Sequence, residues 1–154
     1  MENKDWRANL KDLFEGFEII EMSQKEAREK FSQFREMIAE PAFELLSEEL
    51  KEYRVKSFYT KSKGNTIHFW ISFPRSGKDC FHYTIYLPKN FIDLNLKLRL
   101  RGRRTKKSIF IEREENFMEH LSPSDILKMS SEDLVQNFIL HYRNFRYELH
   151  TRPE

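Results

Sequence analysis

Apolar and polar residues alternate with a period of two through the middle of the chain. The segments with this pattern are Phe58–Lys61, Thr66–Phe73, Phe81–Leu87 and Leu94–Arg101, and a fifth begins at Ile109 and Ile111. Because successive side chains on a β-strand point to opposite faces, each segment predicts a strand with one apolar face. Gly64, Gly77 and Gly102 separate neighbouring segments, where a reversal of the chain favours a positive φ angle. These short links predict an antiparallel meander of about five strands.

Apolar residues spaced by three and four, a pattern typical of helices, precede the strands. A first short helix is marked by Trp6, Leu10, Leu13 and Phe14. We expect it to stop near Gly16, because glycine is a common C-terminal cap. The capping-box pattern Ser23–Glu26 predicts the start of a second helix, which Pro41 should kink or divide in two. The apolar face of that helix consists of Ala27, Phe31, Phe34, Ile38, Ala42, Leu45 and Leu50.

Two more helical segments follow the strands. Ser122 and Asp125 predict a short turn of helix over residues 123–128, and Ser130 with Asp133 predicts the start of a closing helix. The apolar stripe of the closing helix consists of Leu134, Phe138, Tyr142, Phe145 and Leu149. Since the strands are grouped between helices, the chain predicts a single α+β domain over residues 1–154. Its expected parts are N-terminal helices, an antiparallel meander sheet of about five strands, and a C-terminal helix packed on one sheet face.

The alternation also sorts the strand residues onto two sheet faces. The expected neighbours across the first two hairpins are Phe58 with Phe69, Tyr59 with His68, and Trp70 with His82 or Thr84. The apolar positions then share an inner face that the helices can cover. The opposite face, called the outer face below, is expected to carry Tyr59, Lys61, His68, Trp70, His82, Tyr86, Lys97, Arg99 and Arg101.

Charge is strongly segregated along the chain, although the formal net charge is only +2. Residues 1–52 contain 8 Lys and Arg against 14 Asp and Glu, residues 53–107 contain 14 against 2, and residues 108–154 contain 5 against 9. The predicted sheet is therefore basic between two acidic parts, an asymmetry that indicates an electrostatic role. At one rim of the outer face, the basic row continues into Arg103, Arg104, Lys106 and Lys107.

Cations that share a sheet face with aromatic rings suit single-stranded nucleic acid. Basic groups neutralise phosphates and release counterions, while flat rings stack on bases. Open sheets recognise single-stranded RNA in this way. We therefore expect a non-enzymatic nucleic-acid-binding or accessory protein that needs no cofactor and leaves DNA and RNA both open as ligands. The expected contacts are Lys97, Arg99, Arg101, Arg103, Arg104, Lys106 and Lys107 to phosphate, with Trp70, Tyr86 and Tyr59 as aromatic platforms.

Simpler explanations of the same pattern remain open. An antiparallel sheet commonly has one solvated face, on which Lys and Arg are ordinary. The acidic helices can also neutralise the basic strands, and the N-terminal helix can cover Trp70 and Tyr86 as a second core. The main alternative function is a protein-interaction module, such as a subunit, adaptor or inhibitor. In that case the acidic helices or the Arg-rich segment 99–107 meet a partner protein, with no nucleic-acid contact.

Two histidines offer a third hypothesis. His68 and His82 are expected on the outer face near Arg99. A pair of imidazoles beside a cation can provide the catalytic groups of a metal-independent ribonuclease. One ring can remove a 2′-hydroxyl proton while the other protonates the leaving oxygen. Two histidines on adjacent strands are also common as plain polar side chains, so they stand here as candidate catalytic residues without a supporting motif.

The cysteine content and the hydropathy of the sequence limit the possible metal sites, disulfides and membrane contacts. Cys80 and His82 are two residues apart on one predicted strand, with His68 as the obvious third donor, but no CxxC or HExxH pattern supports a metal site. We expect no metal and a buried thiol. A single cysteine allows no internal disulfide, which favours the cytoplasm. No apolar run approaches the roughly 20 residues that span a bilayer, and the first residues lack a secretory-signal pattern, so no membrane contact is expected.

Overall fold

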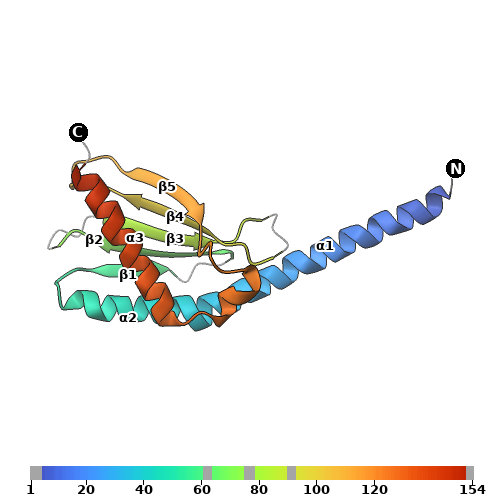
Figure 1. The fold of residues 1–154 in the computed structure, drawn as a ribbon, viewed down its shortest axis with the longest axis horizontal. Helices are drawn as coiled ribbons and strands as arrows, with labels where there is room; N and C mark the ends of the chain where they lie inside the picture. The colour runs from blue at the N-terminus through green and yellow to red at the C-terminus, as the bar shows by residue number, and fades with distance from the viewer. Residues whose placement is uncertain (1–4, 61–63, 75–78, 90–92, 152–154) are drawn as a thin grey trace.

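The chain forms an α+β fold with a long N-terminal helix, a five-stranded antiparallel meander and a C-terminal helix that contacts the sheet (Figure 1). The computed structural model describes residues 5–60, 64–74, 79–89 and 93–151. The helical elements are α1 (Trp6–Phe34), η1 (Arg35–Ala39), α2 (Glu40–Lys51), η2 (Pro123–Lys128) and α3 (Ser131–Thr151). The strands are β1 (Ser57–Thr60), β2 (Thr66–Ser72), β3 (Asp79–Tyr86), β4 (Lys97–Gly102) and β5 (Ile111–Asn116). None of the helices in these ranges combines the length and apolar composition needed to cross a membrane.

Helix α1 runs through both positions at which a break was predicted. Gly16 does not end a helix and Ser23 does not begin one; both lie inside α1, so these two predictions were wrong. A glycine inside a helix costs only about 1 kcal/mol relative to alanine, which is a small penalty against the backbone hydrogen bonds that a break would remove. The predicted interruption near Pro41 is confirmed: the π-helical turn η1 ends at Ala39, two positions before this residue, and separates α1 from α2.

The predicted helix start signals in the C-terminal part are confirmed. Ser122 Oγ donates to Asp125 Oδ2 at 2.9 Å at the beginning of the 3₁₀ helix η2. At the start of α3, the backbone N–H of Asp133 donates to Ser130 Oγ at 3.1 Å, and the backbone N–H of Ser130 donates to Asp133 Oδ2 at 2.9 Å. This reciprocal pair satisfies two backbone donors that the helix itself leaves open.

The sheet order is β1-β2-β3-β4-β5, and of the two partners predicted for Trp70, His82 and Thr84, the structure shows His82. The predicted register of the first hairpin was wrong by one residue. Phe58 lies opposite Trp70, and Tyr59 lies opposite Phe69. A slip of one residue turns every side chain of a strand to the other face. Phe58 is therefore on the outer face and Tyr59 on the inner face.

The inner face forms the core, as the alternation predicted. The strand residues buried there are Ile67, Phe69, Ile71, Phe81, Tyr83, Ile85, Leu98 and Leu100. Helix α2 contributes Phe43, whose ring stacks on Phe69 at 4.8 Å between centroids, and α3 contributes Phe138, which meets Phe69 edge-on at 5.1 Å. Both helices thus cover the same side of the sheet, and neither α2 nor α3 lies over the outer face.

Gly102 serves a purpose different from the predicted one. It is the last residue of β4 rather than part of a turn. A Cβ atom at this position would lie 2.7 Å from Cε1 of Phe145, a buried ring on α3. Glycine therefore lets α3 approach the sheet closely, and any larger side chain would have to displace Phe145. The following strand also begins later than predicted: Ile109 is 86% exposed and precedes β5.

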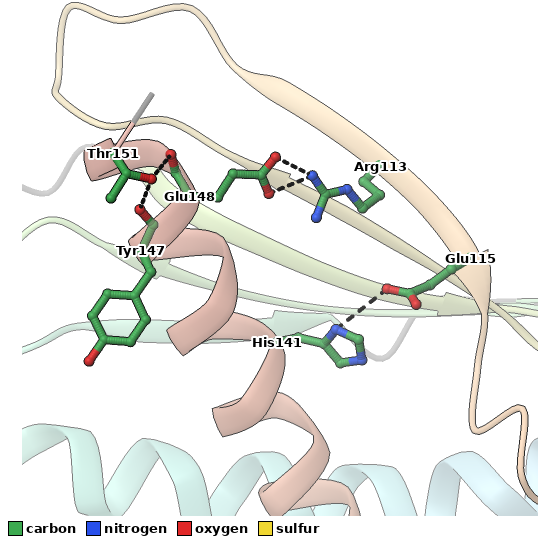
Figure 2. A network of polar contacts seen from close by, with 6 residues as sticks. All are labelled: Arg113, Glu115, His141, Tyr147, Glu148 and Thr151. Carbon is green, nitrogen blue, oxygen red and sulfur yellow. Dashed lines mark hydrogen bonds and ion pairs between the residues drawn. The ribbon is translucent and has the colours of Figure 1, made fainter. Parts of the chain in front are cut away.

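Polar contacts attach the edge strand β5 to α3 (Figure 2). Arg113 of β5 donates to both carboxylate oxygens of Glu148 on α3. About two helical turns away on α3, His141 Nδ1 lies 3.4 Å from Glu115 Oε1. At the end of α3, Thr151 Oγ1 donates to the backbone carbonyls of Tyr147 and Glu148. The inner face at this edge is thus closed by polar side chains instead of apolar ones.

Acidification should destabilise the protein through His141. Burial lowers the pKa of His141 below its ordinary value of 6.5; it outweighs the opposing attraction of Glu115, and Arg113 acts in the same direction as burial. The folded protein therefore takes up this proton less readily than the unfolded chain. The associated stability is complete above about pH 6.5 and is lost as the pH falls towards the folded pKa.

We expect the free energy of unfolding, measured by urea titration, to fall between about pH 7 and pH 5. The His141→Gln variant should lose less stability over the same range, because its side chain cannot take up the proton. Other titrating groups are common to both proteins, so the difference between the two pH profiles isolates His141. Identical profiles would contradict this account.

Candidate nucleic-acid interface

Three rows of side chains cross the outer face. The first row contains Phe58, Trp70, His82, Arg101 and Glu112; the second contains Thr60, His68, Thr84, Arg99 and Glu114; the third contains Thr66, Tyr86, Lys97 and Asn116. In the first row the chemistry changes from aromatic on β1 and β2, through histidine on β3, to cation on β4 and carboxylate on β5. Side chains on the outer face therefore change from aromatic at the β1 edge to charged at the β5 edge.

The rings of the first row stack on one another. Phe58 and Trp70 lie 5.5 Å apart between centroids with an interplanar angle of 24°, and Trp70 and His82 lie 6.2 Å apart at 14°. Phe58 and His82 belong to the strands on either side of Trp70, so they flank its two faces. A nucleic-acid base that reaches this row therefore meets the edge of the half-buried Trp70 ring instead of an open face.

The guanidiniums of β4 are paired with carboxylates of β5. Arg99 Nη2 lies 3.3 Å from Glu114 Oε2, and Arg101 Nε lies 3.5 Å from Glu112 Oε1. The acidic partners of the sheet thus come from the neighbouring strand rather than from the helices. All four side chains are 44–63% exposed, and exposed pairs of this kind contribute about 1 kcal/mol or less. Such weak pairs can be exchanged for phosphate.

Each of these arginines also stacks on a ring. The Arg99 guanidinium lies 5.0 Å from the Tyr86 ring centroid, and the Arg101 guanidinium lies 4.0 Å from that of Phe110. The Tyr86 hydroxyl hydrogen-bonds Glu114 and, together with Arg99, lowers the pKa of that carboxyl. Stacking and pairing hold the two guanidinium planes in place, which favours bidentate contacts with a phosphate.

The segment 103–107, called the basic turn below, carries Arg103, Arg104, Lys106 and Lys107 and connects β4 towards β5. Arg103 Nη1 donates to the backbone carbonyl of Lys106 at 3.1 Å, and Arg146 of α3 donates to the carbonyl of Arg103 at 2.9 Å. Among the residues that the structure describes, no carboxylate pairs with Arg104, Lys106 or Lys107. The basic turn is anchored by backbone contacts, while the described ranges provide no carboxylate that neutralises these three cations.

A surface hollow of about 540 Å³ adjoins the basic turn. Its lining residues are Arg101, Ile109, Phe110 and Glu112. Phe110 also meets His82 edge-on at 5.6 Å, so the hollow is continuous with the first row of the outer face. The hollow thus combines the apolar surface of Phe110 with the charged side chain of Arg101.

Tyr59 does not lie on the outer face, in contrast to the prediction. Because of the register of β1, its ring packs 6.0 Å from that of Phe43, and its hydroxyl donates to Glu44 on α2 at 2.9 Å. Burial and this carboxylate raise the pKa of Tyr59 to about 12. Tyr59 is therefore a contact between β1 and α2. Lys61, which was predicted on the outer face, and Gly77, which was predicted in the turn before Phe81, lie outside the described residues.

His68 and His82 are neighbours, but their geometry does not favour acid–base catalysis. His68 Nε2 lies 2.8 Å from His82 Nδ1, so one ring donates a hydrogen bond to the other. His82 is only 9% exposed. General acid–base cleavage needs a phosphate within reach of both imidazoles. Here the two facing nitrogens are in direct contact, and the space between them cannot hold a substrate.

Cys80 does not share a face with His82. An irregularity in the β2–β3 register, between Ile71 and Ser72, turns Cys80 towards α3, where Arg146 Nη1 lies 3.5 Å from its Sγ. The predicted burial of the thiol is confirmed, and this burial raises its pKa. Within the described ranges, no group of three or more His, Cys, Asp and Glu side chains is arranged to hold a metal ion.

The outer face also carries two aromatic residues that the sequence did not assign to it, Phe58 and Phe110. A signal for Phe110 was present, because it lies between Ile109 and Ile111 and so has the opposite phase in the alternation.

No protein-family model matches this chain, and no curated protein and no solved structure is significantly similar to it. The functional interpretation therefore depends on the geometry of the outer face and the basic turn.

Proposed function

We propose that this protein binds single-stranded nucleic acid through the basic turn and the adjoining cations of β4, without catalysing a reaction. The observation that carries the proposal is the group of cations Arg104, Lys106 and Lys107, which no carboxylate neutralises within the described part of the chain. This group follows β4, whose Arg99 and Arg101 lie on the outer face, and none of the helices in the described ranges covers that face.

The arrangement favours contacts with the phosphate backbone over contacts with bases. The rings of Phe58, Trp70 and His82 stack on each other, so they offer edges and add little stacking area. Phosphate contacts position a nucleic acid without reading its sequence. We therefore propose weak sequence preference, and a ligand that follows the cations from Arg99 to Lys107. With a buried thiol at Cys80, the proposal includes a reducing compartment such as the cytoplasm.

One observation favours the second candidate function, a protein-interaction module. Helix α1 projects from the rest of the molecule and exposes large apolar side chains, among them Trp6 and Phe14, each 60% exposed (Figure 1). Exposed apolar patches mark contacts with other proteins. The residues of α1 that form this surface belong to a different part of the chain from the basic turn, so the two functions do not exclude one another.

Fluorescence anisotropy with a labelled, unstructured single-stranded RNA tests the proposed function. About five phosphate contacts, one for each of Arg99, Arg101, Arg104, Lys106 and Lys107, predict a slope near −3.5 for the logarithm of the association constant against that of the salt concentration. Raising the salt from about 50 to about 200 mM should then weaken binding roughly 100-fold. The same measurement with single-stranded DNA compares the two backbones. Absence of binding to either strand at low salt would contradict the proposal.

A further inference from the structure

Helix α1 carries an apolar stripe that lacks a cover within the described chain. The residues Trp6, Leu10, Leu13, Phe17 and Ile20, called the α1 stripe below, are spaced alternately by four and three positions. Each of their side chains is 43–60% exposed. This spacing is the seam of a coiled coil, in which apolar residues repeat every 3.5 positions on average. The stripe therefore has the pattern of a helix that pairs with another helix.

The same spacing continues into the core of the protein. After Gln24 it passes through Ala27, Phe31, Phe34 and Ile38, which are at most 5% exposed. One continuous stripe thus packs against the protein's own core at its C-terminal end and faces outward at its N-terminal end. Figure 1 shows that this N-terminal part of α1 extends beyond the sheet. Because the C-terminal half of the stripe packs against apolar side chains, we expect the N-terminal half to pack against apolar side chains as well.

We propose that the α1 stripe pairs in antiparallel orientation with the α1 stripe of a second copy of this chain. A two-fold axis near Glu15 places Leu13 of one copy against Phe17 of the other, and Leu10 against Ile20. Trp6 of one copy then reaches Gln24 of the other, where the exposed part of the stripe ends. The stripe is therefore complementary to itself over its whole exposed length.

Residues beside the stripe favour this orientation. In the antiparallel pair, Arg7 of one copy lies beside Glu21 of the other, and symmetry forms this pair of opposite charges twice. Gly16 lies beside its own counterpart, and no atom lies within 4 Å of the position its Cβ would occupy, so the two helices can approach closely. Parallel pairing would instead place Glu21 beside Gly16 and would form neither charge pair.

The available surface agrees with a dimer of moderate affinity. The five stripe residues and Phe14, which is 60% exposed beside the stripe, offer on the order of 600 Å² of apolar surface per copy. Standard stable interfaces bury about 800 Å² per partner, and polar flanks supply the remainder. An overlap from Trp6 to Gln24 is about 28 Å long, which keeps the two sheets at opposite ends of the pair. Pairing through the α1 stripe involves neither the basic turn nor β4, so it is independent of nucleic-acid binding.

Sedimentation equilibrium of the full chain tests the proposal. The wild type should form a dimer with twice the chain mass of 18.8 kDa. The double variant Leu13→Glu, Phe17→Glu should raise the dissociation constant at least roughly 100-fold. Ile19→Glu, Met22→Glu is the matched control, since these side chains are 64% and 62% exposed on the opposite side of the same helix. A monomeric wild type, or a dimer that survives the stripe variant, overturns the proposal.

Cross-linking tests the orientation. A mixture of the variants Arg7→Cys and Glu21→Cys should form a disulfide between the two proteins under mild oxidation. In a parallel pair these positions would be about 21 Å apart along the axis, too far for a disulfide. Each variant alone is the control, because antiparallel pairing separates identical positions by the same distance. Efficient cross-linking of Arg7→Cys with itself overturns the antiparallel arrangement.

Discussion

Replacing Arg104, Lys106 and Lys107 with glutamate should weaken the binding of single-stranded RNA roughly 100-fold or more at low salt. The three cations have no carboxylate partner among the described residues, so their charge is available to phosphate. Each lost contact removes the release of counterions, and each new carboxylate repels the phosphate backbone. Anisotropy titrations of the variant and the wild type at equal ionic strength measure the effect.

The control for this variant changes the same number of charges elsewhere. Lys25→Glu, Arg28→Glu, Lys30→Glu alters three exposed cations on α1 and shifts the net charge by the same amount. If the basic turn binds the ligand, this control should retain most of the wild-type affinity. Equal losses in both triple variants would mean that only the overall charge matters, which would contradict an assigned binding surface.

Replacing Phe138 with alanine should lower the free energy of unfolding by about 3–5 kcal/mol. This side chain is 1% exposed and stands where α3 meets the middle of the inner face. Its ring centroid lies 5.1 Å from that of Phe69, 5.3 Å from that of Tyr83 and 5.8 Å from that of Phe81. Removing it leaves a cavity that three strand residues border. Urea unfolding followed by circular dichroism measures the loss.

The neighbouring residue provides a matched control. Ile139 follows Phe138 on α3 but is 46% exposed. The Ile139→Ala variant should therefore change the free energy of unfolding by about 1 kcal/mol or less. A loss for Phe138→Ala as small as that for Ile139→Ala would show that α3 does not cover the core as described.

The alternation of residues was sufficient to predict the sheet because burial on one face fixes the phase of a strand. Ile67, Phe69 and Ile71 leave one choice of inner face, as do Leu98 and Leu100, and the structure confirms both. The first strand was different. Phe58 and Tyr59 are both aromatic, so either one can face the core, and the pattern of four residues contains no further signal. Contact with α2 decides the phase: Phe43 and Glu44 hold Tyr59 inward.

The helix boundaries and the charge pairing depended on contacts that local patterns do not contain. Gly16 and Ser23 are compatible with a helix end, but the stripe from Trp6 to Ile38 runs past both without a change of phase. The carboxylates opposite Arg99 and Arg101 were present in the sequence at the matching phase, as Glu114 and Glu112. The net charge of whole segments does not reveal these pairs, because the basic segment and the acidic segment form the adjacent strands β4 and β5.

The salt dependence of binding is the sharpest test of the basic turn as a nucleic-acid interface, because its slope counts the phosphate contacts. The wild type should bind single-stranded RNA with a slope near −3.5 in a plot of the logarithm of the association constant against that of the salt concentration, and the variant with Arg104, Lys106 and Lys107 changed to glutamate should give a slope near −1.5. The difference of about two corresponds to three lost contacts. Equal slopes for the two proteins would contradict the assignment of the basic turn as the nucleic-acid interface.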